Sequence, residues 1–335
     1  TNTLAEDTSL VFLGQSGVTA NGLPSLPVQD GSGRVTSLAP TAAANGGSVT
    51  YQFTASKPGT YLYESGTDPR KQVYMGLFGA LIVYPACHAT TCPNQPYDDP
   101  RTQFEPNREF IHMLSEVDPD LNLAVEQGKP FDWSTFAPKY YLLNGRSLPD
   151  TLAPNDAAWL PSQPYGAMVH IRPQGVGGDS LPALIRYLNV SYEPIPFHTH
   201  GNTEQVIALD GSALETPAGP DHTYGSFATD IGQNRTLDAL FSWTDVEHYD
   251  PVSNPIPVSM NSFNDIILKG TFYSMSPYLG VQTPLPSGIT QFNVCGEYYH
   301  IAHDHALKGA TNFGATFGGM GTLIRIDPPF GCPVK

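Results

Sequence analysis

Two pairs of histidines are the residues whose type and spacing suit metal chemistry. His198 and His200 flank Thr199 in the segment PFHTHG, and His303 and His305 lie in YYHIAHDHA. Residues two apart in a strand point to the same face, with roughly 6–7 Å between their Cα atoms. Each pair can therefore direct two imidazoles to one point. Neutral imidazole binds copper, zinc, nickel and iron, so the spacing predicts a metal site.

The two pairs supply a complete ligand set if they meet on neighbouring strands. Four protein ligands, or three with one open position, form a normal metal shell. Asp304 and Thr199 then face away and support the ligands from behind. His300 has the opposite strand parity to His303, so we expect it to face away as well. The competing interpretation is that each pair only makes hydrogen bonds within a loop.

The composition predicts a β-rich chain that does not bind polyanions. The 335 residues include 31 acidic and 16 basic side chains, a formal net charge of −15, which disfavours nucleic acid and anionic lipid as partners. Charged residues make up 14%, and 32 Gly and 32 Pro indicate short strands joined by turns. No apolar run reaches the ~18 residues that span a bilayer. The remaining histidines are predicted to be structural or on the surface: His88, His112, His170, His222 and His248.

Hydrophobic patterning predicts strands almost throughout and no clear amphipathic helix. The continuous apolar run 76–84 is interpreted as a fully buried strand. Residues 245–288 are rich in Pro, Ser and Asn, with only 265–271 patterned, and are interpreted as an insertion. The fold class is therefore all-β, a tandem of antiparallel sandwiches or barrels with Greek-key connections. The predicted strands are 48–55, 60–64, 76–84, 109–114, 139–143, 167–171, 183–190, 204–209, 236–243, 289–305 and 322–326.

A linker rich in Pro, Asp and Cys divides the chain into two predicted domains. Residues 1–86 form the first domain, 87–108 the linker, and 109–335 the second domain with the insertion 245–288.

The cysteines are grouped in sequence, which predicts the disulfides Cys87–Cys92 and Cys295–Cys332. Disulfides fit an oxidising compartment, so we expect a secreted, periplasmic or extracellular protein. The alternative is four unpaired buried thiols. The sequence starts without an export signal, which we expect to have been removed or to lie outside it.

Five segments, and the order in which they occur, resemble the multicopper oxidases. They are YQFTASKPGTYLYESG at 51–66, MGLFGALIVYP at 75–85, YYLLNGRSLPDT at 140–151, PFHTHGNTEQVIALDG at 196–211 and GGMGTLIRIDPP at 318–329. The resemblance extends over most of the chain. It implies two tandem cupredoxin-like Greek-key sandwiches around a trinuclear copper cluster that four HxH motifs hold. It also implies a separate blue copper, bound by a Cys, two His and often a Met.

The third and fourth copper motifs of the family match at the cluster ligands but not at the blue-copper ligands. The third motif, HPxHxH, reads IPFHTH at 195–200, where Ile195 replaces the blue-copper histidine. The fourth, HCHxxxH, reads HDHALKG at 303–309, where Asp304 replaces the cysteine and Gly309 the last histidine. A blue copper site needs a thiolate, so we expect this site and full laccase-type oxidation to be lost. The matching cluster ligands are His198, His200, His303 and His305.

The first two copper motifs have lost their imidazoles. The second, an HxH after GTYxY, falls on Glu64-Ser65-Gly66, and the first, HWHG after TS, falls on Val11-Phe12-Leu13-Gly14. Four of the eight cluster ligands implied by the resemblance therefore remain, all in the second domain. They suit one copper ion, or two, with zinc as an alternative. Glu64 is interpreted either as an additional ligand or as a surface or interface carboxylate.

The first sandwich is expected to be incomplete. In the family several strands precede the segment that resembles TNTLAEDTSL, and none precedes it here. Truncation or processing explains this, and so does a protein partner or second copy that supplies strands to the open edges.

Three functions follow as hypotheses. The first is a degenerate copper-binding relative of the multicopper oxidases with single-site redox chemistry. The second is a structural or interaction protein, an assembly or filament subunit with a relic metal site. The third is an oxidase whose missing ligands come from a partner chain.

Overall fold

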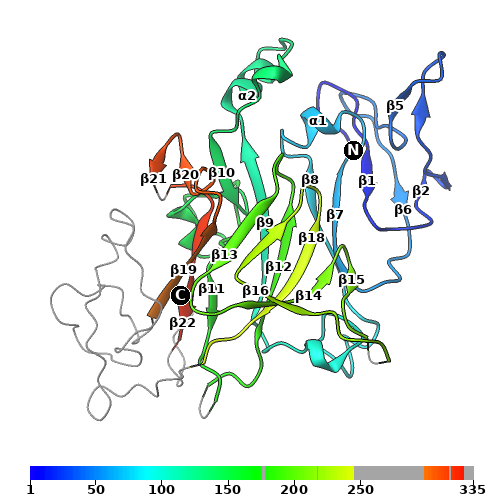
Figure 1. The fold of residues 1–335 in the computed structure, drawn as a ribbon. Helices are drawn as coiled ribbons and strands as arrows, with labels where there is room; N and C mark the ends of the chain where they lie inside the picture. The colour runs from blue at the N-terminus through cyan, green and yellow to red at the C-terminus, as the bar shows by residue number, and fades with distance from the viewer. Residues whose placement is uncertain (176–177, 217, 245–297, 317, 328–335) are drawn as a thin grey trace.

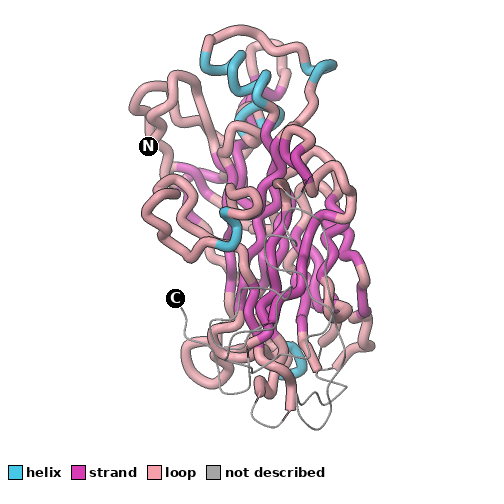
Figure 2. Tube along the Cα trace, turned by 90° about the vertical axis from the view of Figure 1, so that its left-hand side faces the viewer, coloured by secondary structure: helices cyan, strands magenta, loops and turns pink. Residues whose placement is uncertain are grey.

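Strands dominate the computed structural model, which describes residues 1–175, 178–216, 218–244, 298–316 and 318–327. Figure 1 shows the strands side by side along the long axis of the molecule, and Figure 2 shows loops around them. Among the described residues, α1 (Pro69–Gln72) and α2 (Pro119–Glu126) are the α-helices. Neither is long and apolar enough to cross a membrane. The predicted insertion 245–288 lies outside the described residues.

The first part of the chain forms a three-stranded sheet in the order β1-β7-β8, seen at the upper right in Figure 1. Its strands are β1 (Leu10–Phe12), β7 (Gly59–Ser65) and β8 (Phe78–Val83). Smaller sheets join β2 (Thr19–Ala20), β3 (Leu23–Pro24) and β6 (Tyr51–Gln52), and join β4 (Val28–Gln29) to β5 (Val35–Ser37). The predicted strand 48–55 is therefore reduced to two residues.

The interpretation of 76–84 as a fully buried strand is wrong. β8 is the last strand of its sheet, and residues 78–82 are only half-buried. Phe78 and Ala80 pack on a cluster that includes Leu62 and Met113, but β8 has no strand on its other side among the described residues. A continuous apolar run reports the hydrophobicity of a strand and not the number of its neighbours.

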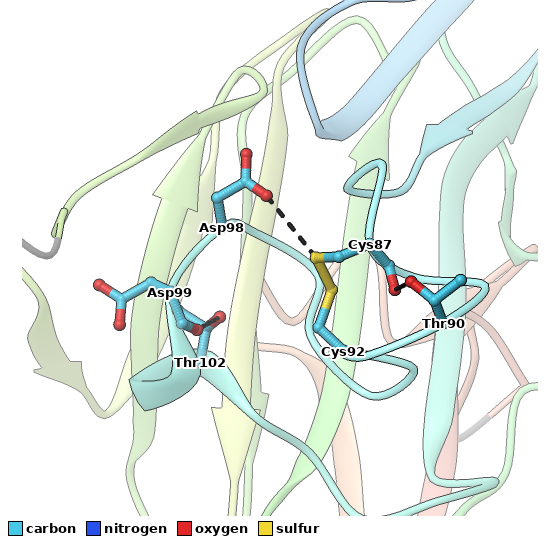
Figure 3. The surroundings of a disulfide bond; sticks show 6 residues. All are labelled: Cys87, Thr90, Cys92, Asp98, Asp99 and Thr102. Atoms are coloured by element: carbon cyan, nitrogen blue, oxygen red, sulfur yellow. Dashed lines mark hydrogen bonds between the residues drawn. A yellow bond between two sulfur atoms is a disulfide. The ribbon is translucent and has the colours of Figure 1, made fainter.

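The linker carries the predicted disulfide between Cys87 and Cys92, which Figure 3 shows. The two Cα atoms are 5.3 Å apart, a normal disulfide span. Thr90 Oγ1 donates to the Cys87 carbonyl at 3.1 Å, and the short 3-10 helix η1 (Pro100–Thr102) follows. The prediction for Cys87 and Cys92 is confirmed. The predicted Cys295–Cys332 bridge lies outside the described residues.

Two larger sheets after the linker build the second part of the chain. One has the order β10-β9-β12-β18-β14-β15, with β16 also on β14, and the other has the order β11-β22-β19-β13-β17. Most pairs are antiparallel, but β9–β12 and β11–β22 are parallel, so the sheets are mixed where purely antiparallel sheets were expected. The predicted boundaries at 86 and 108 stay predictions.

Seven of the predicted strands lie in these sheets close to their predicted ranges, and the described end of 289–305 forms an eighth, whereas β13, β15, β16 and β17 were not among the predicted strands. The strands of the two sheets are β9 (Glu109–Val117), β10 (Tyr140–Leu143), β11 (Val169–Ile171), β12 (Ala183–Asn189), β13 (Ile195–Thr199), β14 (Glu204–Leu209), β15 (Ser212–Ala213), β16 (Tyr224–Ser226), β17 (Ala228–Ile231), β18 (Thr236–Phe241), β19 (Tyr298–Asp304) and β22 (Gly321–Ile326). A small hairpin joins β20 (Thr311–Asn312) to β21 (Ala315–Thr316). Two further 3-10 helices are η2 (Trp133–Thr135) and η3 (Asp150–Leu152).

The main core lies between the two larger sheets. Ile185 and Phe241 from one sheet and Phe197 and Ile324 from the other are fully buried in it. The helix α2 lies outside this core and was not predicted. Its start is visible in the sequence, because Asp118 caps the helix by accepting from the Asp120 N–H at 2.8 Å and Pro119 follows at the first position.

A buried ion network joins the first sheet to the second part of the chain. Arg186 on β12 is fully buried, and its Nη1 donates to Asp238 on β18 at 2.8 Å and to Thr60 on β7 at 2.9 Å. Its Nε donates to Glu109 at 2.6 Å. A buried charge is tolerated only when it is paired in this way, so the network fixes β7 over β12 and β18.

Candidate metal centre

The register of β13 and β19 brings the two histidine pairs together. His198 lies directly opposite His303 across the antiparallel ladder. The pairing continues past the strand ends, because the His200 N–H donates to the Ile301 carbonyl at 2.9 Å and the His305 N–H donates to the Pro196 carbonyl at 2.8 Å. Strand parity therefore places each second histidine on the same face as the first.

The four imidazole rings form one cluster. The ring centre of His198 lies 4.5 Å from that of His200, 5.7 Å from that of His303 and 5.2 Å from that of His305. The His200–His303 and His303–His305 distances are 5.5 and 5.8 Å. Rings that bind one tetrahedral ion at about 2.0–2.1 Å have centres about 5 Å apart. The observed spacings match that value.

The cluster is not a finished coordination shell. In the part of the chain that the structure describes, no three His, Cys, Asp or Glu side chains present their donor atoms as a metal-binding group. The ring centres nevertheless stand at the separations that one ion requires.

Hydrogen bonds hold two of the rings with one nitrogen free for a metal. His198 Nδ1 lies 2.6 Å from the carbonyl oxygen of Phe227, and His303 Nδ1 lies 2.8 Å from that of Asp304. A carbonyl only accepts, so each Nδ1 carries the proton and each Nε2 keeps its lone pair. This second hydrogen bond is the usual way in which proteins orient a ligating histidine.

Burial keeps the rings in the neutral form that binds metals. It lowers the pKa of His198 and His303 below the usual value, and it lowers the pKa of His200 to about 4. Neighbouring imidazoles lower these pKa values further, because each disfavours a second positive charge nearby. At neutral pH no proton competes with a metal at these three nitrogens.

Phe227 covers part of the cluster, and the sequence interpretation did not identify it. Its ring lies 4.1 Å from that of His198 and 5.8 Å from that of His305, and it is 64% exposed. The contact depends on the pairing of β13 with β17, which places Ala228 opposite His198. No sequence signal announces that pairing. Since His305 is also exposed, the cluster opens to solvent on this side.

The blue-copper positions implied by the resemblance hold a buried carboxyl group and close packing. Asp304 is 1% exposed and accepts from the Ala306 N–H at 2.9 Å. Burial raises its pKa to about 7, and nearby Glu193 adds to the rise. A Cβ on Gly309 would lie 1.8 Å from Asp304 Oδ2, so no side chain fits there unless Asp304 moves. Ile195 is buried in the main core.

Glu64 lies on β7, directly opposite Val11 on β1. It is 6% exposed, and burial raises its pKa. Its Oε1 accepts from Asn234 Nδ2 at 3.4 Å, and its Oε2 has no hydrogen-bond partner among the described residues. Its role as a ligand stays a prediction.

The other histidines are not part of the four-ring cluster, although His300 lies close enough to His200 for burial and the His200 ring together to lower the pKa of His300. His300 is 1% exposed, its ring centre lies 6.1 Å from that of Trp243, and burial lowers its pKa to about 3. His112 is buried beside Tyr187, and His88 stacks on Tyr84. The remaining two described ones are His170, in an ion network, and the exposed His222, while His248 lies outside the described residues.

Comparison with known proteins connects this geometry to one fold. No family model and no curated protein matches the chain. Among solved structures, the blue copper oxidase from Nitrosomonas europaea is 17% identical, with a TM-score of 0.55 over 97% of this chain and 70% of its own. The chain has the fold of the multicopper oxidases. The multicopper oxidase mgLAC matches with a TM-score of 0.55 at 15% identity, over 100% of this chain and 73% of its own.

The laccase from Botrytis aclada shares the same fold, with a TM-score of 0.52 at 13% identity. This chain is covered completely in that match but corresponds to 46% of the laccase. The all-β cupredoxin architecture predicted from the sequence is confirmed. Fold does not transfer activity, so the chemistry of this multicopper-oxidase-like chain depends on its own side chains.

Proposed function

We propose that the protein binds copper through His198, His200, His303 and His305. The observation that supports this most is the cluster of four rings at the separations that a single ion requires. The donor set fits, because neutral imidazole is a good ligand for copper and for zinc. One ion satisfies the four nitrogens, and a second ion would need ligands that this cluster does not supply.

The residues of this chain would bind the ion and orient the imidazole rings, while copper would supply one-electron redox chemistry when bound. The carbonyls of Phe227 and Asp304 hold His198 and His303 with Nε2 available. The exposed side at His305 gives a small molecule access to the centre. The chain has no thiolate at 304, and Val11 and Leu13 hold no metal, so we propose that laccase-type reduction of oxygen is lost. The disulfide Cys87–Cys92 supports a secreted, periplasmic or extracellular location.

Metal counting tests the proposal. The purified chain is loaded with Cu(II) or Zn(II), dialysed and analysed for metal, with His200→Gln and His305→Gln compared against His222→Gln, which alters an exposed histidine. We expect about one copper per chain, lost in the first two variants and kept in the control. Electron paramagnetic resonance should show nitrogen couplings without intense blue colour. Equal copper in all three variants would contradict the proposal, and retention of zinc alone would replace copper with zinc.

A second candidate function is an interaction protein that uses the cupredoxin scaffold. The unpaired edge of β8 favours it, since its six apolar residues, FGALIV, include no charge and no proline. Sedimentation of the metal-free protein over a range of concentrations tests this candidate. A stable assembly supports it, and a monomer at every concentration counts against it.

A further inference from the structure

A groove of about 1370 Å³ runs between β8 and β9 and extends to Tyr299 on β19 and to Leu323 and Arg325 on β22. Five consecutive residues of β9, Glu109 to Met113, line it, and so do Phe78, Gly79, Ala80 and Ile82 of β8. A strand that turned one face to a cavity would contribute only alternate residues. The consecutive lining shows that β9 presents its edge. We call this cavity the open-edge groove.

In the part of the chain that the structure describes, no strand pairs with the outer edge of β9 over its first half. β10 pairs only with Leu114–Val117, and the Asn144 N–H donates to the Met113 carbonyl at 2.9 Å. Backbone groups alternate along a ladder, so those of Ile111 and Glu109 point to the same side as those of Met113. The Ile111 carbonyl accepts from Asn144 Nδ2 at 2.8 Å. The Ile111 N–H and both groups of Glu109 have no partner strand among the described residues.

Among the described residues, no strand pairs with the outer edge of β8, where the Phe78 N–H donates to the Gly76 carbonyl at 3.0 Å. The Ser65 N–H donates to the Leu77 carbonyl at 3.0 Å, which identifies residues 77 and 65 as a hydrogen-bonded pair of the β7–β8 ladder. By alternation, Gly79 and Leu81 bond to β7, while the backbone groups of Ala80 and Ile82 point outward. Within the described chain no strand takes up these outward groups.

We propose that the open-edge groove binds an extended polypeptide segment as an added β-strand, with apolar side chains at alternate positions and a carboxylate at one end. Strand addition satisfies the outward backbone groups and places alternate side chains in pockets. The walls offer aromatic contacts from Phe78, Phe110 and Tyr165 and an aliphatic contact from Ile82. The cavity is larger than the ~300–1,000 Å³ of a small-molecule pocket, which favours a chain over a compact ligand.

Positively charged groups at one end of the groove favour binding of the peptide's carboxylate there. Arg325 and His170 line the groove, within a network of three guanidinium groups and two carboxylates. Asp327 contacts Arg325 at 2.6 Å, Arg108 at 3.8 Å and His170 at 3.6 Å. Asp179 contacts Arg108 at 3.5 Å and Arg172 at 2.6 Å. Its three guanidinium groups exceed its two carboxylates by one positive charge, in a chain of net charge −15.

The acidic residue on the groove does not cancel this excess. Glu109 also lines the groove, but its Oε1 accepts from Arg186 at 2.6 Å and its Oε2 from the Tyr84 hydroxyl at 2.7 Å. Its carboxylate is therefore already committed to the buried network. Charge complementarity favours a peptide carboxylate at the end of the groove near Arg325.

Fluorescent peptides test the proposal. Four peptides of the form Thr-X-Thr-X-Thr-X-Glu, with X as Val, Leu, Phe or Tyr, are titrated with the full chain and followed by anisotropy. We expect at least one to bind saturably, with binding about tenfold weaker when its ladder-side amides are N-methylated and about tenfold weaker when Glu is replaced by Gln. No saturable binding by any of them up to about 1 mM would overturn the proposal.

Variants with matched controls locate the site. Ala80→Pro removes an outward donor without breaking the β7 ladder, and Ala80→Ser keeps the donor. Arg325→Gln is matched by Arg235→Gln, which breaks a surface pair with Asp210. We expect Ala80→Pro to bind the peptide about tenfold more weakly than the wild type. Arg325→Gln should bind the Glu peptide and the Gln peptide equally well. Both control variants should bind the peptide with dissociation constants within about twofold of the wild-type value.

Other occupants give distinct results. If Ala80→Pro does not fold, the N-methylated peptides decide the backbone dependence with the wild-type chain. Equal binding of methylated and unmethylated peptides would show a simple apolar pocket and overturn the proposal. A dimer in sedimentation that Ala80→Ser keeps and Ile82→Lys removes would identify a second copy as the occupant instead. His200→Gln should bind peptide like wild type, so failure of the copper proposal and failure of this one are separable.

Discussion

The strand pairs β13–β19 and β1–β7 use the same backbone device with different side chains. In each, two antiparallel strands place a residue of one directly opposite a residue of the other, His198 opposite His303 and Val11 opposite Glu64. Both pairs fall where the resemblance places HxH motifs. Only the first pair carries imidazoles, so only it gathers nitrogen donors. The comparison teaches that register creates the position of a site and that side-chain chemistry decides its use.

Removing the cross-strand imidazoles should have the largest effect on this comparison. The double variant His198→Gln, His303→Gln removes the two imidazoles that face each other across β13 and β19. This strand pair then lacks facing imidazoles, as β1 and β7 do. We expect copper affinity to fall by more than about 100-fold, because half of the ligands are lost. Isothermal titration with copper measures this. An affinity within about threefold of wild type would show that the register pair is not the basis of the site.

Installing imidazoles in the second pair should have the next largest effect. In Val11→His, Glu64→His two rings face each other across β1 and β7, as His198 and His303 do across their own ladder. We expect a second copper equivalent that binds at least about tenfold more weakly than the first, because two ligands form half of a normal shell. Metal analysis at rising copper gives the stoichiometry. A second site as strong as the first would mean that ligand number does not set the difference.

Replacing Glu64 alone should change the pH dependence of stability. Burial raises the pKa of Glu64, so the folded state keeps its proton longer than the unfolded state as the pH rises. The carboxyl therefore costs stability progressively once the pH exceeds its ordinary value, and nothing below it. We expect Glu64→Gln to raise the melting temperature at pH 8 and to leave it unchanged at pH 4. Glu126→Gln, at an exposed site on α2, should leave the melting temperature unchanged at both pH values.

Truncating the cover of the imidazole cluster should have the smallest effect. Phe227→Ala removes the ring beside His198 but keeps the carbonyl that accepts from Nδ1. We expect copper affinity to change by less than about threefold, since the ligand and its orienting hydrogen bond remain. Copper should, however, exchange faster with a chelator because the ring no longer shields it. A fall of tenfold or more in affinity would assign the ring a direct part in holding the ion.

Sequence patterning predicted strands well where a short segment of apolar residues is bounded by turn residues. Residues 204–209 and 322–326 were predicted within one residue, because apolar residues are concentrated in them between turn residues. It failed at 76–84, where the same hydrophobicity belongs to an edge strand. It also missed α2, although Asp118 and Pro119 mark its start. Local patterns carry no information on which strand lies beside another.

In the candidate site, too, local spacing predicted some features, while others depend on contacts between segments far apart in the chain. The spacing of His198 with His200 and of His303 with His305 predicted which rings share a face, since the strand period is a local property. The contribution of Phe227 was not predictable, because it depends on the pairing of β13 with β17. The close approach of Gly309 to Asp304 was equally hidden, as it joins a strand end to the loop that follows it.

The amino-acid sequence by itself determined the types of the candidate ligands, the all-β character and the disulfide between Cys87 and Cys92, because each depends on residue identity or on short spacing. Only the tertiary structure decided that the two histidine pairs lie opposite each other and that no strand of the described chain covers the outer edges of β8 and of the first half of β9. Register and edge exposure arise from contacts between segments far apart in the chain, and such contacts have no local signature.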